Sequence, residues 1–208
     1  MGSLLEYSDA VKLVREYGIE APESRYVSSA EDAVDFSRGR SIALKVISNK
    51  ALHKSKSGVV MVNLTGRDEI VDAFNHLKSR AVRGRLSPYR ILAQVMAEPG
   101  TEIIIGGSTD AQFGKLVLVG MGGIYVEVFK DFAMRVCPIN EYDAKSMLKE
   151  LRSRSVIAPD RDTERMVVEL LLRTSKLLTE NERISELDLN PIIIRRGGYS
   201  AVDIRVLV

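Results

Sequence analysis

Hydrophobic and polar residues alternate along the C-terminal stretch of the chain, from residue 185 to residue 207. Two apolar runs, Leu187–Ile194 and Tyr199–Leu207, flank an Arg-Gly-Gly corner at Arg196–Gly198. Two apolar runs separated by a glycine turn are typical of a β-hairpin. The pattern therefore predicts that the chain ends in two antiparallel strands.

Elsewhere the spacing of apolar residues predicts helices and strands in both halves of the chain. Apolar positions three and four residues apart predict helices, and short apolar runs bounded by turn residues predict strands. The predicted helices cover residues 4–17, 30–37, 66–81, 141–154 and 163–180, with Ser29 and Asn140 as caps. The predicted strands cover 25–27, 41–48, 59–64, 91–97, 101–106 and 115–120, with extended chain at 125–138 and polar loops at 49–58 and 107–114.

This order of elements defines an α+β fold with two lobes. Residues 22–93 form a small lobe of β-α-β-β-α-β order, and residues 1–21 and 94–208 form the large lobe. The sequence shows no internal repeat and no long linker. We therefore expect residues 1–208 to form one domain.

Composition and charge narrow the range of functions. Thirty Lys and Arg residues nearly balance 28 Asp and Glu residues, so the net charge of +2 gives no reason to expect a nucleic-acid partner. No run of about 18 apolar residues is present, and we expect no membrane segment. Cys137 is the only cysteine, which excludes an internal disulfide and fits a cytoplasmic protein.

The C-terminal hairpin carries a candidate metal site. Alternate residues of a strand share a face, so Glu186, Asp188 and Asn190 project together. Asp203 interrupts the returning apolar strand, where a charge is costly unless it is paired or bound to a metal. Carboxylate and amide oxygens suit Mg²⁺ when water and phosphate oxygens complete its shell. The alternative is a solvated outer face on which these side chains have no function.

Three further positions suggest phosphate chemistry. Lys45 lies inside an apolar strand, so its ammonium group must reach an anion or water. The loop 49–58 combines three lysines, two serines and His53, which is the composition of a phosphate-holding loop and also of many solvated turns. Imidazole can carry a phosphoryl group, which makes His53 the candidate nucleophile. Glu102 opens a strand, where its carboxylate can bind ribose hydroxyls or face water.

Seven short motifs together make the chain resemble a known family. In order along the chain they are Leu44–Ser48 (L-K-V-I-S), Leu52–Ser55 (L-H-K-S), Pro99–Gly106 (P-G-T-E-I-I-I-G), Asp110–Gly114 (D-A-Q-F-G), Gly120–Glu127 (G-M-G-G-I-Y-V-E), Phe132–Arg135 (F-A-M-R), and E-L-D-L-N-P with A-V-D at the C-terminus. Each motif alone is weak, but their order and spacing are specific. The chain resembles the ATP-grasp β subunit of ADP-forming acetate–CoA ligases.

The resemblance implies a fold, a reaction and a role for each candidate residue. It implies an ATP-grasp fold in which ATP or ADP binds between two lobes, and the reaction acyl-CoA + phosphate + ADP = acid + CoA + ATP. His53 would be a phosphohistidine oriented or charge-paired by Asp188, and the α subunit would supply the CoA-binding and ligase domains in a hetero-oligomer. The implied nucleotide contacts are Lys45 with phosphates, Gln94, Val95 and Met96 with adenine, and Glu102 with ribose, while Asn190 and Asp203 would hold Mg²⁺.

The chain departs from the family pattern at three places. Lys56 stands where the loop after His53 usually has an acid, and Val59 where it usually has a second glycine. Val95 replaces the glutamate of the usual Q-E-M hinge, and Gly39-Arg40-Ser41 replaces the usual G-Y-P. The changed loop after His53 motivates one alternative, an ATP-binding regulatory module without the relay. A second alternative is a stand-alone ATP-grasp carboxylate–amine ligase. The sequence does not identify the acyl group or distinguish ADP from GDP.

Overall fold

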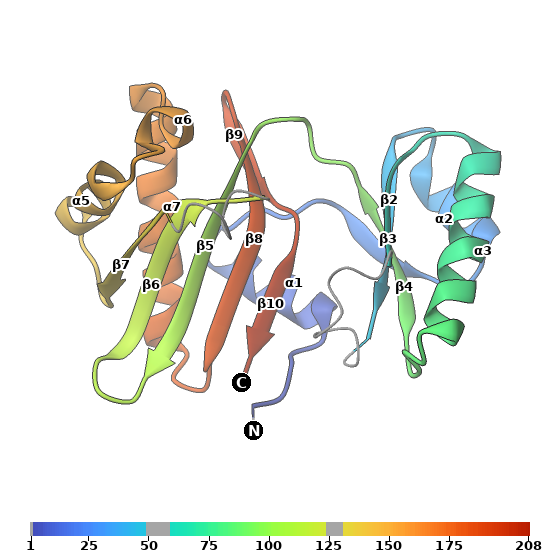
Figure 1. The fold of residues 1–208 in the computed structure, drawn as a ribbon, viewed down its shortest axis with the longest axis horizontal. Coiled ribbons are helices and arrows are strands. Elements are labelled where there is room, and N and C mark those ends of the chain that lie inside the picture. The colour runs from blue at the N-terminus through green and yellow to red at the C-terminus, as the bar shows by residue number, and fades with distance from the viewer. Residues whose placement is uncertain (1, 49–58, 124–130) are drawn as a thin grey trace. The chain divides into compact units, whose positions relative to one another are not determined.

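The computed structural model describes residues 2–48, 59–123 and 131–208, and its helices and strands confirm the predicted α+β class (Figure 1). The chain divides into two compact units. Unit 1 comprises Met1–Ala21 and Ala97–Val208, and unit 2 comprises Pro22–Met96. The candidate residues are distributed over both units.

Unit 2 has the predicted β-α-β-β-α-β order. Its elements are β1 (Ser24–Val27), α2 (Ala30–Ser37), β2 (Ile42–Ile47), β3 (Val60–Leu64), α3 (Arg67–Arg83) and β4 (Arg90–Val95). The strands form an antiparallel sheet in the order β1-β4-β2-β3. The Ser29 hydroxyl accepts a hydrogen bond of 3.1 Å from the Asp32 N–H, which confirms the predicted helix cap.

The core of unit 2 lies between its sheet and its helices. Ile42, Leu44 and Val46 of β2 belong to the same buried cluster as Ile70, Phe74 and Leu77 of α3. Side chains alternate across a strand, so Ala43 and Lys45 project from the other face of the sheet. The burial of the apolar half of β2 thus determines where Lys45 points.

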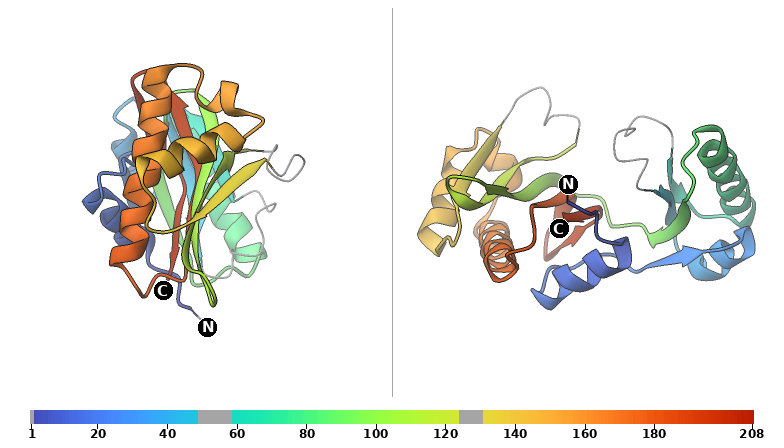
Figure 2. Two further views of the ribbon diagram at one scale, coloured as in Figure 1. Left: turned by 90° about the vertical axis from the view of Figure 1, so that its left-hand side faces the viewer. Right: turned by 90° about the horizontal axis from the view of Figure 1, so that it is seen from below.

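Unit 1 is built on a six-stranded antiparallel sheet in the order β10-β8-β5-β6-β7, with β9 also paired to β8. Helices α1, α5, α6 and α7 contact the strands of this sheet, and Figure 2 shows them in relation to it. The elements are α1 (Tyr7–Glu16), β5 (Thr101–Asp110), β6 (Gly114–Met121), β7 (Phe132–Val136), α5 (Glu141–Glu150), α6 (Arg154–Ile157), α7 (Arg161–Glu180), β8 (Glu186–Arg195), β9 (Gly198–Ala201) and β10 (Ile204–Leu207).

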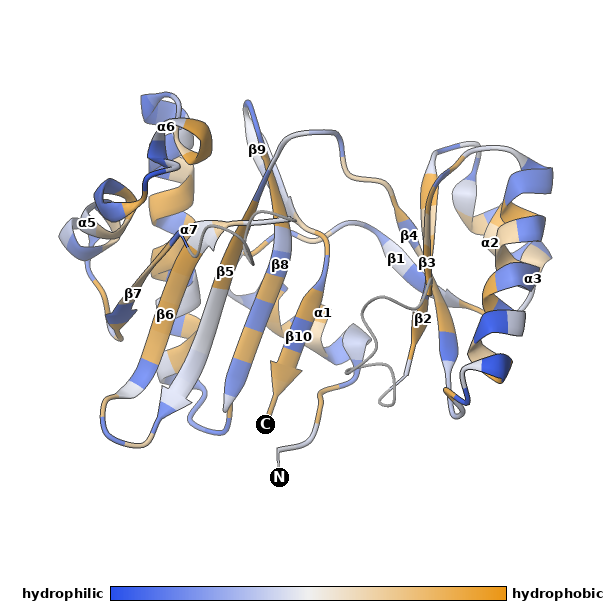
Figure 3. Cartoon of the chain, in the orientation of Figure 1, coloured by the Kyte–Doolittle hydropathy of each residue, from blue (hydrophilic) through white to orange (hydrophobic). Residues whose placement is uncertain are grey.

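The two faces of this sheet differ in chemistry. Hydrophilic and hydrophobic positions alternate along β8 (Figure 3). Leu187 and Leu189 are buried with Ile103 and Ile105 of β5. Glu186, Asp188 and Asn190 project from the opposite face, which we call the Asp188 face, together with Glu102, Ile104 and Gly106 of β5. The alternation predicted from the sequence is therefore confirmed.

The C-terminal hairpin is also confirmed, with one addition. Arg195 pairs with Gly198 across the glycine turn. The returning strand is interrupted at Val202 and Asp203, and both of its parts, β9 and β10, pair with β8. The residue that disturbed the apolar pattern of the returning run is thus the residue at which that strand breaks.

Three predicted boundaries were wrong because tertiary contacts outweighed local pattern. Residues 107–110 continue β5 instead of starting a loop, since all four pair with β6 and the first two also pair with β8. The helix predicted at 141–154 ends at Glu150, because the Asp131 carboxylate accepts hydrogen bonds from the N–H groups of Arg152 and Ser153. The first helix begins at Tyr7, because Leu4 forms a β-bridge with Leu207.

Gly107 allows α7 to pack directly on β5. A Cβ atom at this position would lie 2.4 Å from Cδ1 of Leu178, whose side chain is fully buried. We expect Gly107→Ala to lower the free energy of unfolding by about 1–3 kcal/mol through overpacking. Urea denaturation measures the change. Gly198→Ala is the control, since its added Cβ would meet only the flexible end of the Arg195 side chain, at 3.4 Å, and an equal loss in both variants would contradict the packing argument.

Candidate functional site

Asp188, Asn190 and Asp203 come together at the junction of β8, β9 and β10. The backbone N–H of Asn190 donates a hydrogen bond of 3.1 Å to the carbonyl oxygen of Asp203. This bond holds the strand break at Asp203 beside the middle of β8. The structure therefore places Asp203 of the returning segment beside Asp188 and Asn190 of β8, three oxygen-bearing residues that the sequence had selected.

The Asp188 side chain is partly buried in the middle of its sheet. It lies between Gly106 of β5 and Arg205 of β10 in the sheet register. Burial, together with the nearby acids Asp203 and Glu186, raises the pKa of its carboxyl group to about 6, although the Arg205 guanidinium opposes the shift. Perturbed carboxylates of this kind are common at functional sites, although ion-pair networks also produce them.

Arg205 is a residue of this cluster that the sequence reasoning missed. Its guanidinium lies 3.7 Å from a carboxylate oxygen of Asp203. It pairs in register with Asp188 across β10 and β8. The available signal was its spacing of two residues from Asp203, but its relation to Asp188 depends on strand register, which the sequence does not give.

Glu102 lies on the same sheet, beside a glycine corner. Its carbonyl oxygen accepts a hydrogen bond of 2.8 Å from Gly122 N–H. A Cβ atom at Gly123, which has φ +68°, would lie 2.7 Å from a Glu102 carboxylate oxygen. Only glycine allows this approach without strain, so the Gly-Met-Gly-Gly motif shapes the surroundings of the Glu102 carboxylate.

Unit 2 brings Lys45 and Gln94 together on the face of its sheet away from α3. Ala43 pairs with Gln94 and Lys45 with Leu92, which makes Lys45 and Gln94 diagonal neighbours on β2 and β4. Lys45 is 8% exposed and Gln94 is 1% exposed, and both have interaction partners in the structure. Such sheltered polar groups are expensive to retain unless they have a role or a partner.

Val95 and Met96 continue the chain beyond Gln94. The Val95 N–H donates to the Glu23 carbonyl oxygen over 2.9 Å, and the Met96 N–H donates to the Ser41 carbonyl oxygen over 3.0 Å. Both N–H groups are therefore satisfied within unit 2. Any adenine contact from these two residues has to come from their other atoms.

His53 and the rest of the phosphate-loop prediction lie outside the described residues. The part of the chain that the structure describes contains no group of three or more His, Cys, Asp or Glu residues able to hold a metal ion by themselves. A cation bound by Asn190 and Asp203 would thus take most of its ligands from elsewhere. This fits Mg²⁺, which usually keeps several waters and binds substrate phosphates with one or two carboxylates.

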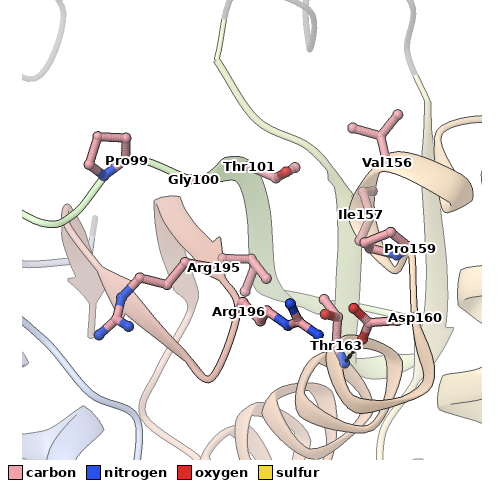
Figure 4. A pocket seen from close by; sticks show the side chains of 11 residues that line it. Pro99, Gly100, Thr101, Val156, Ile157, Pro159, Asp160, Thr163, Arg195 and Arg196 are labelled. Atoms are coloured by element: carbon pink, nitrogen blue, oxygen red, sulfur yellow. Dashed lines mark hydrogen bonds between the residues drawn. The ribbon is translucent and has the colours of Figure 1, made fainter.

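A separate pocket of about 440 Å³ lies in unit 1 (Figure 4). Its lining comes from the start of β5, the α6–α7 corner and the hairpin turn, and includes Thr101, Val156, Asp160 and Arg196. None of the predicted site residues lines it. Within the described residues, no helix is both long and apolar enough to cross a membrane.

Comparison with known proteins defines the class to which this fold and these residues belong. The family model described as an ATP-grasp domain matches residues 2–208. The chain is therefore a member of the ATP-grasp family, which confirms the predicted fold. Within that family it belongs with the β subunits of ADP-forming acetate–CoA ligases, as its sequence motifs predicted.

Two relatives and one solved structure support this assignment. The chain is 34% identical to the β subunit of ADP-forming acetate–CoA ligase II of Pyrococcus furiosus, over 99% of this chain and 92% of that subunit. It is also 34% identical to ADP-forming acetate–CoA ligase I of Archaeoglobus fulgidus, but spans only 30% of that longer protein. An acetyl-CoA synthetase 1 structure from Ca. Korarchaeum cryptofilum, complexed with coenzyme A and Mg-AMPPCP, has a phosphohistidine segment pointing towards the nucleotide site. This chain matches it with TM-score 0.82 and 35% identity, over 99% of this chain and 92% of that one.

Proposed function

We propose that this chain is the nucleotide-binding, phosphohistidine-relay subunit of an ADP-forming acyl-CoA synthetase. The reaction is acyl-CoA + phosphate + ADP = acid + CoA + ATP. The observation that carries the proposal is the convergence of Asp188, Asn190 and Asp203 at one point of the sheet, in a chain that matches ligase β subunits over nearly its full length. The two units correspond to the two lobes of the ATP-grasp domain.

The roles of the residues follow from their chemistry. Asn190 and Asp203 hold Mg²⁺, which neutralises phosphate charge when it is bound. Lys45 contacts nucleotide phosphates from unit 2. Its burial among apolar residues restricts the directions in which its ammonium group can point. Glu102 accepts hydrogen bonds from ribose hydroxyls, and the Gln94–Met96 segment contacts adenine.

His53 and Asp188 carry the transfer step. A phosphoryl group passes from a histidine of the α subunit to His53 and then to the β-phosphate oxygen of ADP. At the second transfer the N–P bond of His53 breaks and a P–O bond of ATP forms. Asp188 orients the imidazole and pairs with its positive charge, which stabilises the phosphorylated ring.

The remaining parts of the reaction belong to a partner. This chain spans 92% of a relative named as a β subunit but 30% of one named as the whole ligase. CoA binding and the acyl chemistry therefore fall to an α subunit in a hetero-oligomer. A cytoplasmic location for this reaction is supported by the single cysteine of the sequence, which fits a reducing compartment.

The test is transfer of label from γ-³²P-ATP to the full chain with Mg²⁺, with and without the α subunit. We expect acid-labile, base-stable label on the wild type and complete loss of it in His53→Ala. His76→Ala is the matched control, because His76 is exposed on α3 and should leave labelling unchanged. A wild-type chain that binds ATP but takes up no label, even with the α subunit, would contradict the relay and favour a regulatory module.

A further inference from the structure

Three carboxylates lie near one another where β8 meets the strand break at Asp203. Glu186 and Asp188 project from the same face of β8, and the hydrogen bond of 3.1 Å from Asn190 N–H to the Asp203 carbonyl holds Asp203 beside them, so three carboxylates share one region. Arg205 brings a positive charge to these carboxylates. Its guanidinium forms an ion pair with Asp203, and it pairs with Asp188 in the strand register. The position of one guanidinium among three acids requires an explanation.

We propose that Arg205 is a positioning residue that compensates these carboxylates, so that the site takes up a divalent cation together with nucleotide phosphates and not alone. This inference rests on the proposed function. Arg205 adds positive charge where a free cation would otherwise be attracted. The same positive charge favours binding of a nucleoside diphosphate, whose phosphates would otherwise be repelled by three carboxylates.

The position of Arg205 is determined by the packing of its strand. Its neighbours Ile204 and Val206 are buried, with exposed fractions of 2% and 0%. Because side chains alternate along β10, Arg205 must project from the face opposite those two residues. Its side chain is 41% exposed, which leaves the guanidinium accessible to a phosphate while it stays beside Asp203.

The donor set supports a site that is incomplete without the nucleotide. Among the residues that the structure describes, no three metal-binding side chains are grouped closely enough to hold an ion. Asn190 contributes an uncharged oxygen, and the ion pair with Arg205 partly neutralises the charge of Asp203. Phosphate oxygens would then supply both the missing ligands and the missing negative charge, while Arg205 stabilises the phosphates.

The experiment measures two affinities of the full chain by titration calorimetry: that for Mn²⁺ without nucleotide, and that for ADP with saturating Mg²⁺. For Arg205→Ala we expect Mn²⁺ to bind about tenfold tighter and Mg–ADP to bind about tenfold weaker, because one positive charge is removed from the site. Arg205→Lys keeps the charge and should restore both affinities to within about threefold of the wild type.

Opposite changes in the two affinities separate this role from a structural one. If both affinities fall together in Arg205→Ala, or if neither changes, Arg205 does not compensate the carboxylates. Arg154→Ala is the matched control: Arg154 forms an ion pair with Glu164 at 2.9 Å, its side chain is 44% exposed, and it lies on α6 away from the Asp188 face. A wild type that binds no Mg–ADP would contradict the proposed function, whereas an unchanged Mn²⁺ affinity in Arg205→Ala would contradict the role of Arg205 whether or not nucleotide binds.

Discussion

Replacing Asp203 with alanine is expected to lower the affinity of the chain for Mg–ADP by about 100-fold, a loss of roughly 3 kcal/mol. Asp203 is the only carboxylate proposed to bind the cation directly, and alanine offers neither charge nor a ligand oxygen. The other proposed ligand, Asn190, offers only a neutral amide oxygen. Turnover with the α subunit should fall with the affinity, because the bound cation neutralises the phosphates.

The fold should survive this substitution. The Asp203 side chain is 34% exposed, and its residue lies in the break between β9 and β10. The hydrogen bond from Asn190 uses the backbone carbonyl of Asp203, which alanine retains. Circular dichroism and urea denaturation should therefore resemble those of the wild type.

Isothermal titration calorimetry with ADP and Mg²⁺ measures the effect. Asp162→Ala provides the matched control, since the Asp162 carboxylate is 92% exposed on α7 and lies in a single ion pair at 3.9 Å. Unchanged Mg–ADP affinity in a folded Asp203→Ala variant would exclude Asp203 as a metal ligand. A loss of the same size in Asp162→Ala would show a general effect of charge.

Local patterns in the sequence predicted most of this fold. Alternation along β8 identified which side chains share a face, although the returning run was predicted as one strand and divides into β9 and β10 at Val202 and Asp203. Ser29 and Asn140 both cap the helices expected of them, with hydrogen bonds from residues three positions further on. In each case the determining interaction is local, so the sequence contains it.

The features that the sequence did not predict depend on residues far apart in the chain. Gly106 and Gly107 suggest a loop, yet glycine is required at position 107 because Leu178 of α7 packs against it. The end of α5 is set by Asp131, about twenty residues earlier. The relation of Arg205 to Asp188 exists only once the register of β10 on β8 is fixed. Sequence patterns therefore predict which face of a strand each side chain occupies and which residues cap a helix. Tertiary contacts set the register of the strands and the exact boundaries of the elements.

Ionisation of the Asp188 carboxyl group should lower the free energy of unfolding of the protein. Burial raises the pKa of its carboxyl group from the ordinary 3.8 to about 6. Between these two values the unfolded chain has lost the proton while the folded protein still holds it. The favourable contribution of the protonated group is therefore fully present below pH 3.8 and is lost as the pH rises through about 6.

The Asp188→Asn variant is expected to be more stable than the wild type at pH 7.5, because the amide needs no ionisation. One pKa unit corresponds to about 1.4 kcal/mol, and partial exposure of the side chain reduces the gain to about 1–2 kcal/mol. The difference between variant and wild type should shrink as the pH is lowered to 4.5. Urea denaturation at both pH values, with EDTA present, measures it.

Asp162→Asn is the control for this experiment, because the Asp162 carboxylate is 92% exposed on α7. If Asp188→Asn is less stable than the wild type at pH 7.5, the ionised carboxylate is stabilised in the fold and the argument is wrong. The same variant should transfer little phosphoryl group from His53, because its amide cannot pair with a charged imidazole. A gain in stability together with a loss of transfer is expected where a fold retains a costly charge for its function.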